Sequence, residues 1–216
     1  MVSDPSLFGD SCVTLPILLE FSMSIRSRAA RFVAVLAVAA IAPSIAGAQA
    51  APAAAPTPLK VGEMAPDFTV TVITQAGVAA KPFKLSEHKG ETVVLAFFPK
   101  ARTSGCTVQM ESYRDKYAQT FQGGKKVTLV GVSIDSDTAL ISWAKDAKFQ
   151  FHFAADTDRK VGVAYGANGG AGFHKRTLYV IDPTGKISYV AAPFNQMSAD
   201  AYTDLGSAIV HAGSSH

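Results

Sequence analysis

The stretch Thr92-Val-Val-Leu-Ala-Phe-Phe-Pro-Lys-Ala-Arg-Thr-Ser-Gly-Cys-Thr107 decides the predicted fold of this chain. Its first seven residues are almost all apolar, which is typical of a strand buried in the middle of a sheet. Pro99 ends that run, and aromatic residues at steps of four along 105–121 predict a helix that two glycines terminate. The stretch therefore predicts a strand, a loop and a helix that carries Cys106 in its first turn.

A cysteine at the start of a helix is a candidate nucleophile. Unpaired backbone N–H groups and the helix dipole favour the thiolate form there. The second cysteine, Cys12, lies near the N-terminus, so Cys106 has no partner within the folded region. A lone cysteine in an apolar sequence can also be a small buried hydrophobe. The spacing of Pro99 and Thr103 ahead of Cys106 favours chemistry over that simpler interpretation.

The regions around this stretch alternate between strand and helix patterns. The sequence predicts strands at 67–73, 127–133, 176–182 and 186–191, the last two joined by a Pro-Thr-Gly turn, and helical segments at 84–90, 137–147, 158–165 and 198–210. This order predicts an α/β protein with a thioredoxin-like fold, in which helices flank a central mixed β-sheet. The glycine-rich stretch 162–170 lacks the strand-to-helix context of a nucleotide site and is interpreted as a flexible loop.

The N-terminal region has the order of an export signal. Residues 23–48 contain three arginines, an apolar run and small residues, which predicts a signal peptide and a periplasmic location. An uncleaved membrane anchor is the alternative, although the apolar core is short for a span. Residues 1–22 form a doubtful extension, 49–60 an Ala/Pro linker, and 61–212 the predicted domain.

Composition excludes several function classes. A formal net charge of +3 over 216 residues does not favour nucleic-acid binding. The five histidines show no ligand spacing, so we expect neither a metal site nor a cofactor. His174 could pair with Cys106 as in a cysteine hydrolase, but no third orienting residue or oxyanion motif supports that arrangement.

Pro99, Thr103 and Cys106 reproduce the Pro-x-x-x-Thr-x-x-Cys signature of peroxiredoxins. The chain resembles this family, in its AhpC/TSA-type members and most of all in the bacterioferritin-comigratory branch. The similarity begins at the segment 61–68 and extends to the predicted hairpin that starts near Arg176. It implies a thiol-dependent peroxidase in which Cys106 attacks a peroxide and becomes a sulfenic acid.

The resemblance also implies roles for the neighbours of Cys106. Thr103 would accept a hydrogen bond from the peroxide, and Pro99 would fix the loop and shield the sulfur. Arg176 resembles the arginine that holds the thiolate charged, with Arg102 as its rival or assistant. Because no proline occupies the region of Arg176, where thioredoxins carry one, and because no Cys-x-x-Cys pair is present, disulfide exchange is disfavoured.

The chain departs from the branch at two positions. Related proteins often carry Glu three residues after the nucleophile and a resolving cysteine five residues after it, where this chain has Gln109 and Glu111. The missing thiol implies a one-cysteine cycle completed by an external thiol, either a thioredoxin-like protein or a small molecule. The uncharged Gln109 is expected to weaken the hydrogen bonds around the loop, so a redox sensor without turnover is the alternative function.

The predicted partners are therefore a peroxide and an external thiol reductant. Membrane contact is expected only if the leader stays uncleaved, and the resemblance allows self-association as a homodimer.

Overall fold

The computed structural model describes residues 57–170 and 172–214. The doubtful extension, the predicted signal peptide and most of the linker lie outside the described residues, so these predictions and the periplasmic location stay predictions. Within residues 57–170 and 172–214, no helix has the length and apolar character needed to cross a membrane.

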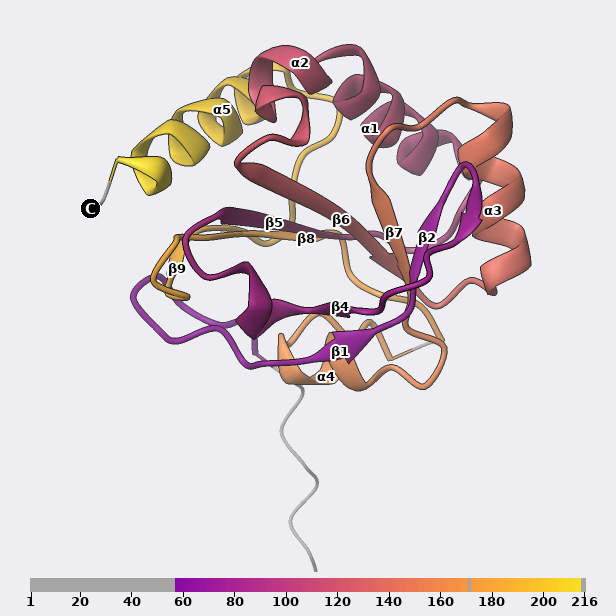
Figure 1. The fold of residues 1–216 in the computed structure, drawn as a ribbon, viewed down its shortest axis with the longest axis horizontal. Helices are drawn as coiled ribbons and strands as arrows, with labels where there is room; N and C mark the ends of the chain where they lie inside the picture. Colours follow the sequence, from indigo (N-terminus) through magenta and orange to yellow (C-terminus); the bar gives the residue numbers. More distant parts are fainter. Residues whose placement is uncertain (1–56, 171, 215–216) are drawn as a thin grey trace, which may run out of the picture. The chain divides into compact units, whose positions relative to one another are not determined.

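A seven-stranded mixed sheet forms the centre of the domain (Figure 1). Its strand order is β3 (Gly77–Val78), β2 (Val72–Thr74), β7 (His152–Ala155), β6 (Val127–Ser133), β5 (Thr92–Phe97), β8 (Thr177–Ile181) and β9 (Ile187–Ala191). β5 pairs in parallel with β6 and antiparallel with β8. A separate two-stranded sheet joins β1 (Thr69–Val70) to β4 (Phe83–Lys84). The predicted mixed sheet and thioredoxin-like α/β fold are confirmed.

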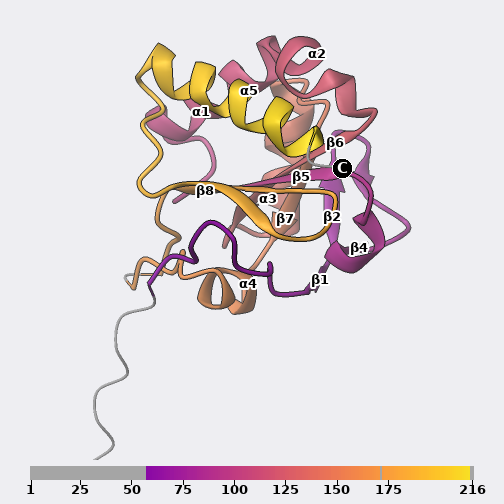
Figure 2. The ribbon, with the colours of Figure 1, turned by 90° about the vertical axis from the view of Figure 1, so that its left-hand side faces the viewer.

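Helices cover both faces of the sheet (Figure 2). One face carries α1 (Ser104–Asp115), α2 (Tyr117–Thr120), α3 (Asp137–Asp146) and α5 (Ala199–Gly213), while the other carries α4 (Lys160–Ala164) and the β1–β4 pair. Short 3-10 turns occur at η1 (Leu85–His88) and η2 (Gln122–Gly124). We call the two sides the α1 face and the α4 face.

β5 is the strand that positions the site. All six of its residues are buried, as the apolar run 92–98 predicts. Val94 and Ala96 pack under the α1 face, and the alternate residues Leu95 and Phe97 pack under the α4 face. The strand ends at Phe97, so the following loop leads directly to the first turn of α1.

Four features differ from the sequence prediction. The strand predicted at 67–73 is divided into β1 and β2, which belong to different sheets. The helix predicted over 105–121 is interrupted at Lys116, whose φ of −101° separates α1 from α2. Strand β7 was not predicted, although it joins β6 to β2 in the sheet. The signal was available, because Phe149, Phe151 and Phe153 alternate with Gln150 and His152 at a spacing of two. Part of the stretch interpreted as a loop, 162–170, also belongs to α4.

Candidate active site

Cys106 is the third residue of α1 and is completely buried. It is the only cysteine among the described residues, since Cys12 lies outside them. Its neighbours in the core of the α1 face include Met110 and Tyr113 on the same helix. The structure thus places a free thiol in an apolar setting at the N-terminus of a helix.

The start of α1 leaves backbone donors beside the sulfur. Thr103 is the N-cap residue, yet within the described part of the chain its side chain makes no capping hydrogen bond. Its hydroxyl donates instead to the carbonyl oxygen of Lys100, at 3.0 Å. The first backbone N–H groups of a helix lack intrahelical partners, so the N–H of Cys106 is directed toward any ligand at this end. The oxygen of Thr103 keeps its lone pairs for accepting a hydrogen bond.

Arg176 reaches the sulfur from the neighbouring strand. The register of β5 and β8 pairs Phe97 with Thr177, which brings Arg176 beside the end of β5 and the loop to α1. Nη2 of Arg176 donates to Sγ of Cys106 at 3.4 Å. The carbonyl oxygen of Arg176 accepts from the backbone N–H of Phe194 at 2.9 Å, which fixes the backbone at that point. A cation in this position stabilises a thiolate.

Gln109 joins Arg176 to a tyrosine inside α1. Nη1 of Arg176 donates to Oε1 of Gln109, and Nε2 of Gln109 donates to the hydroxyl of Tyr113 at 2.8 Å. Gln109 is fully buried. Tyr113 lies in the core with 1% exposure, and the sequence analysis missed its hydroxyl contact with Gln109. The signal was available, because positions 106, 109 and 113 share one face of a helix.

The loop before α1 is held by the helix α3 and the turn that precedes it. The backbone N–H of Ala101 donates to Asp135 at 2.7 Å. Arg102 has a left-handed φ of 61°, and its guanidinium donates to Ser142 and Asp146 on α3. Within the described residues, Arg102 therefore makes no hydrogen bond to Cys106, unlike Arg176. The geometry assigns it to the anchoring of the loop.

Two other predicted neighbours occupy the margins of the site. Pro99 is half-buried directly after Phe98 and lines a cavity of about 480 Å³ together with Lys100, Ile134 and other residues. Glu111, at the position of the absent resolving cysteine, lies 3.6 Å from Arg114. No step of the chemistry involves Glu111.

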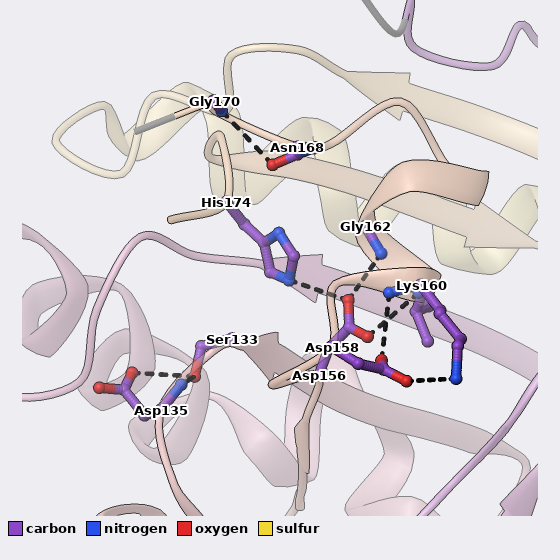
Figure 3. A network of polar contacts seen from close by, with 10 residues as sticks. Ser133, Asp135, Asp156, Asp158, Lys160, Gly162, Asn168, Gly170 and His174 are labelled. Carbon is purple, nitrogen blue, oxygen red and sulfur yellow. Dashed lines mark hydrogen bonds and ion pairs between the residues drawn. The ribbon is translucent and has the colours of Figure 1, made fainter. Parts of the chain in front are cut away.

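His174 lies on the α4 face, next to Asp156 (Figure 3). Its ring is fully buried and edge-on to Phe97, and its Nε2 is 3.1 Å from Oδ2 of Asp156. Among the described residues, no hydrogen bond or ion pair joins His174 to Cys106. This arrangement gives no support to a cysteine–histidine hydrolase.

The chemistry available to this arrangement follows from the donors around one sulfur. A thiolate beside Arg176 can attack an electrophile, and the N–H of Cys106 with the guanidinium can stabilise negative charge that develops on a leaving oxygen. Among residues 57–170 and 172–214, no group of three or more His, Cys, Asp or Glu side chains could hold a metal ion.

Comparison with known proteins agrees with this chemistry. Residues 61–190 match the AhpC/TSA family. The peroxiredoxin Bcp of Escherichia coli strain K12 is 32% identical over 144 residues, which cover 63% of this chain and 88% of that protein.

Solved structures show the same fold. The crystal structure of peroxidoxin BcpB from Mycobacterium tuberculosis has a TM-score of 0.60 and 28% sequence identity, and the match covers 71% of this chain and 97% of that one. The crystal structure of a PrxQ mutant from Xylella fastidiosa has a TM-score of 0.61 at 19% identity, with coverage of 72% and 99%, and it supports the fold alone. The chain belongs to the AhpC/TSA family and is a peroxiredoxin similar to the bacterioferritin-comigratory branch.

Proposed function

We propose that this peroxiredoxin is a thiol-dependent peroxidase that reduces hydrogen peroxide or organic hydroperoxides with Cys106 as its only redox-active thiol. The observation that carries the proposal is the 3.4 Å contact between Nη2 of Arg176 and Sγ of Cys106 in the first turn of α1. A half-buried guanidinium in this place stabilises the anion that attacks.

The first step is a displacement at oxygen. The thiolate of Cys106 attacks the terminal peroxide oxygen, an S–O bond forms, and the O–O bond breaks with its electron pair on the departing oxygen. Sulfur is oxidised to a sulfenic acid, while the departing oxygen is reduced and takes a proton from solvent to leave as water or an alcohol.

Neighbouring groups orient the peroxide for this step. The hydroxyl of Thr103 donates to Lys100, so it would meet the peroxide O–H as an acceptor. The backbone N–H of Cys106 and the guanidinium of Arg176 would stabilise charge on the breaking bond. Pro99 would hold the loop that covers the sulfur. In this proposal Thr103, Pro99 and Arg176 act together with Cys106 as the site residues.

The cycle closes with two external thiols. The first condenses with the sulfenic acid, releases water and forms a mixed disulfide with Cys106. The second displaces Cys106 and leaves the external pair oxidised as a disulfide. Glu111 cannot serve as the resolving group, and Cys106 is fully buried. A bulky reductant therefore reaches the sulfur only when the residues that cover it move.

The test is a stopped-flow titration with hydrogen peroxide, with intact-mass detection of the sulfur's oxidation state. A Cys12→Ser protein leaves Cys106 as its sole thiol, and Cys106→Ser is the matched control. We expect rapid Cys106-dependent turnover with a generic thiol reductant. One equivalent of oxidation without turnover would instead favour the redox-sensor alternative, and no Cys106-dependent oxidation would refute the peroxidase.

We propose in addition that the protein is exported to the periplasm. The order of arginines, apolar run and small residues over 23–48 supports this location. Intact mass of protein released from the periplasm tests it, with an N-terminus near residue 49 as the expected result.

A further inference from the structure

The hydroxyl of Tyr113 is the innermost member of a chain of contacts that ends on the sulfur. It accepts from Nε2 of Gln109, whose Oε1 accepts from Nη1 of Arg176, whose Nη2 donates to Sγ of Cys106. Three of these four residues lie on one face of α1, and Arg176 comes from the segment before β8. The chain of contacts therefore ties the thiol to the core behind it.

The two middle members of this chain are planar groups. The terminal torsion of a glutamine is soft, so its partners set the plane of the amide. Fixing Nε2 of Gln109 on Tyr113 also fixes Oε1, because both atoms lie in that plane. The guanidinium of Arg176 is a rigid fork, so holding Nη1 determines where Nη2 lies. The position of the Tyr113 hydroxyl thus sets the plane of the Gln109 amide, and this amide sets the position of the Arg176 guanidinium beside Cys106.

Burial makes the hydroxyl contact necessary. Gln109 is fully buried, so Nε2 cannot turn to bulk solvent for a replacement partner. A buried donor without a partner is costly, and rotation of the amide to find one would withdraw Oε1 from Arg176. Burial also raises the pKa of Tyr113 well above its ordinary value, so the hydroxyl stays neutral and can accept this bond.

The ring of Tyr113 is itself held on several sides. It makes edge contacts with Phe121, Phe151 and Tyr202, at centroid distances of 5.4, 6.4 and 5.9 Å. Its hydroxyl therefore occupies one position in the core, and it offers Nε2 of Gln109 an acceptor that does not move.

We propose that Tyr113 is a positioning residue for the peroxidase reaction, which holds Gln109 so that Arg176 is presented to the thiolate of Cys106. The inference rests on the proposed function and deepens it. Among the described residues Tyr113 makes no hydrogen bond to the sulfur, so its effect on the thiolate passes through Gln109.

The test compares Tyr113→Phe with the wild type in the Cys12→Ser background. The substitution removes one oxygen and keeps the ring, so the protein should fold. The readout is the ultraviolet absorbance of the thiolate as a function of pH, corrected with the Cys106→Ser version of each protein. We expect the thiolate to appear at higher pH in Tyr113→Phe, with about threefold less of it on the rising part of the curve. Peroxide oxidation of Cys106 should slow by a similar factor.

Tyr117→Phe is the matched control. Tyr117 contacts the same ring of Phe121, at 5.9 Å, but its hydroxyl makes no hydrogen bond to Gln109 in the described structure. Loss of this hydroxyl should leave the thiolate curve unchanged. An equal shift in both variants would mean that the loss of either hydroxyl, and not of the contact to Gln109 in particular, sets the result, and would overturn the proposal.

A second background isolates the route through Gln109. Gln109→Met removes both hydrogen bonds of the amide, so adding Tyr113→Phe to it should change the thiolate curve by less than about 1.5-fold. An undiminished effect of Tyr113→Phe in that background, or no effect in the wild type, contradicts the proposal. The absorbance needs no peroxide, so failure of this inference is distinguishable from failure of the peroxidase function.

Discussion

Each face of the sheet buries a network of polar side chains, and the two networks differ in whether they contain the candidate nucleophile. On the α1 face, Cys106, Gln109 and Tyr113 are buried with Arg176 at their edge, and Cys106 lies in the first turn of α1. On the α4 face, Asp156 and His174 are equally buried, but their groups face other parts of the same domain (Figure 3).

The Asp156 carboxylate organises the α4 face. Its oxygens accept the backbone N–H groups of Val161 and Gly162, at 3.1 and 2.7 Å, at the start of α4. Nε2 of His174 approaches the same carboxylate without hydrogen-bond alignment, and Nδ1 has no hydrogen-bond partner among the described residues. Arg176 is two residues beyond His174, so one short segment connects the two networks. We infer that the α1 face supports reactivity and the α4 face supports the segment that delivers Arg176.

The largest expected effect is on the α1 face, at Arg176. Arg176→Met removes the only cation that the described structure places on Sγ of Cys106. We expect the rate constant for oxidation by hydrogen peroxide to fall about 100-fold, as when one donor to a developing charge is removed elsewhere. Arg176→Lys should recover little of this rate constant, because a single ammonium group cannot reproduce the geometry in which two guanidinium nitrogens donate to Gln109 and Cys106 at once. Stopped-flow oxidation measures both variants.

The stability of Arg176→Met should change much less than its rate of oxidation. The side chain of Arg176 is half-buried at the margin of the core, but its loss leaves Oε1 of the buried Gln109 without a partner, so the free energy of unfolding of Arg176→Met in urea should fall by about 1 kcal/mol. A large loss of stability with an unchanged rate in the folded protein would reverse the distinction between the two faces.

On the α4 face, Asp156→Asn should reduce stability more than rate. Asparagine offers one oxygen where two backbone N–H groups need acceptors, and it removes the charge beside His174. We expect the free energy of unfolding in urea to fall by about 3 kcal/mol. Asp158→Asn, on an exposed carboxylate of the same turn, is the control and should leave the unfolding midpoint unchanged. A collapse of the peroxide rate in folded Asp156→Asn would show that this network is catalytic.

Gly162→Ala tests the packing of the same network. A Cβ at position 162 would lie 2.2 Å from Cε1 of His174, so the imidazole has to move. Despite the better helix propensity of alanine, we expect a loss of about 1–3 kcal/mol in unfolding free energy. Gly206→Ala in α5 is the matched control, because its Cβ would meet only Thr120, at 4.0 Å. Gly206→Ala should raise the free energy of unfolding. A change of the same sign in both variants would contradict the packing argument.

The sequence predicted the elements around the thiol because their signals are local. The apolar run of β5, the break at Pro99 and the helix that follows are contiguous, so the place of Cys106 follows from the order of residues alone. Arg176 was predicted through the family resemblance, and the structure brings it to the sulfur. Its approach depends on the register of β8 against β5, which joins residues about 80 positions apart and which no local pattern reveals.

The α4 face shows what local patterns could not supply. Asp156 and His174 are separated by a helix and a glycine-rich stretch, and neither carries a signal that predicts the other. Gly162 fell within both the predicted helical segment 158–165 and the stretch interpreted as a flexible loop. Neither prediction indicated that its lack of a side chain makes room for the imidazole of His174. Gln109 was also interpreted incompletely. The sequence analysis expected its uncharged side chain to weaken the hydrogen bonds around the loop, but it did not consider Tyr113 as a second hydrogen-bond partner.

The smallest expected effect concerns Arg102, which the sequence analysis ranked as the rival of Arg176. Its hydrogen bond lowers the pKa of Asp146 below the ordinary value of 3.8, so the interaction is complete at neutral pH and is lost as the pH falls through that lowered value. Both side chains are exposed, and solvent and salt screen the pair. Arg102→Ala should therefore change the peroxide rate less than about twofold at neutral pH, with any loss of stability diminishing in high salt or strong acid. A rate loss near that of Arg176→Met would mean that Arg102 reaches the sulfur during the reaction, and the division of labour between the two arginines would have to be withdrawn.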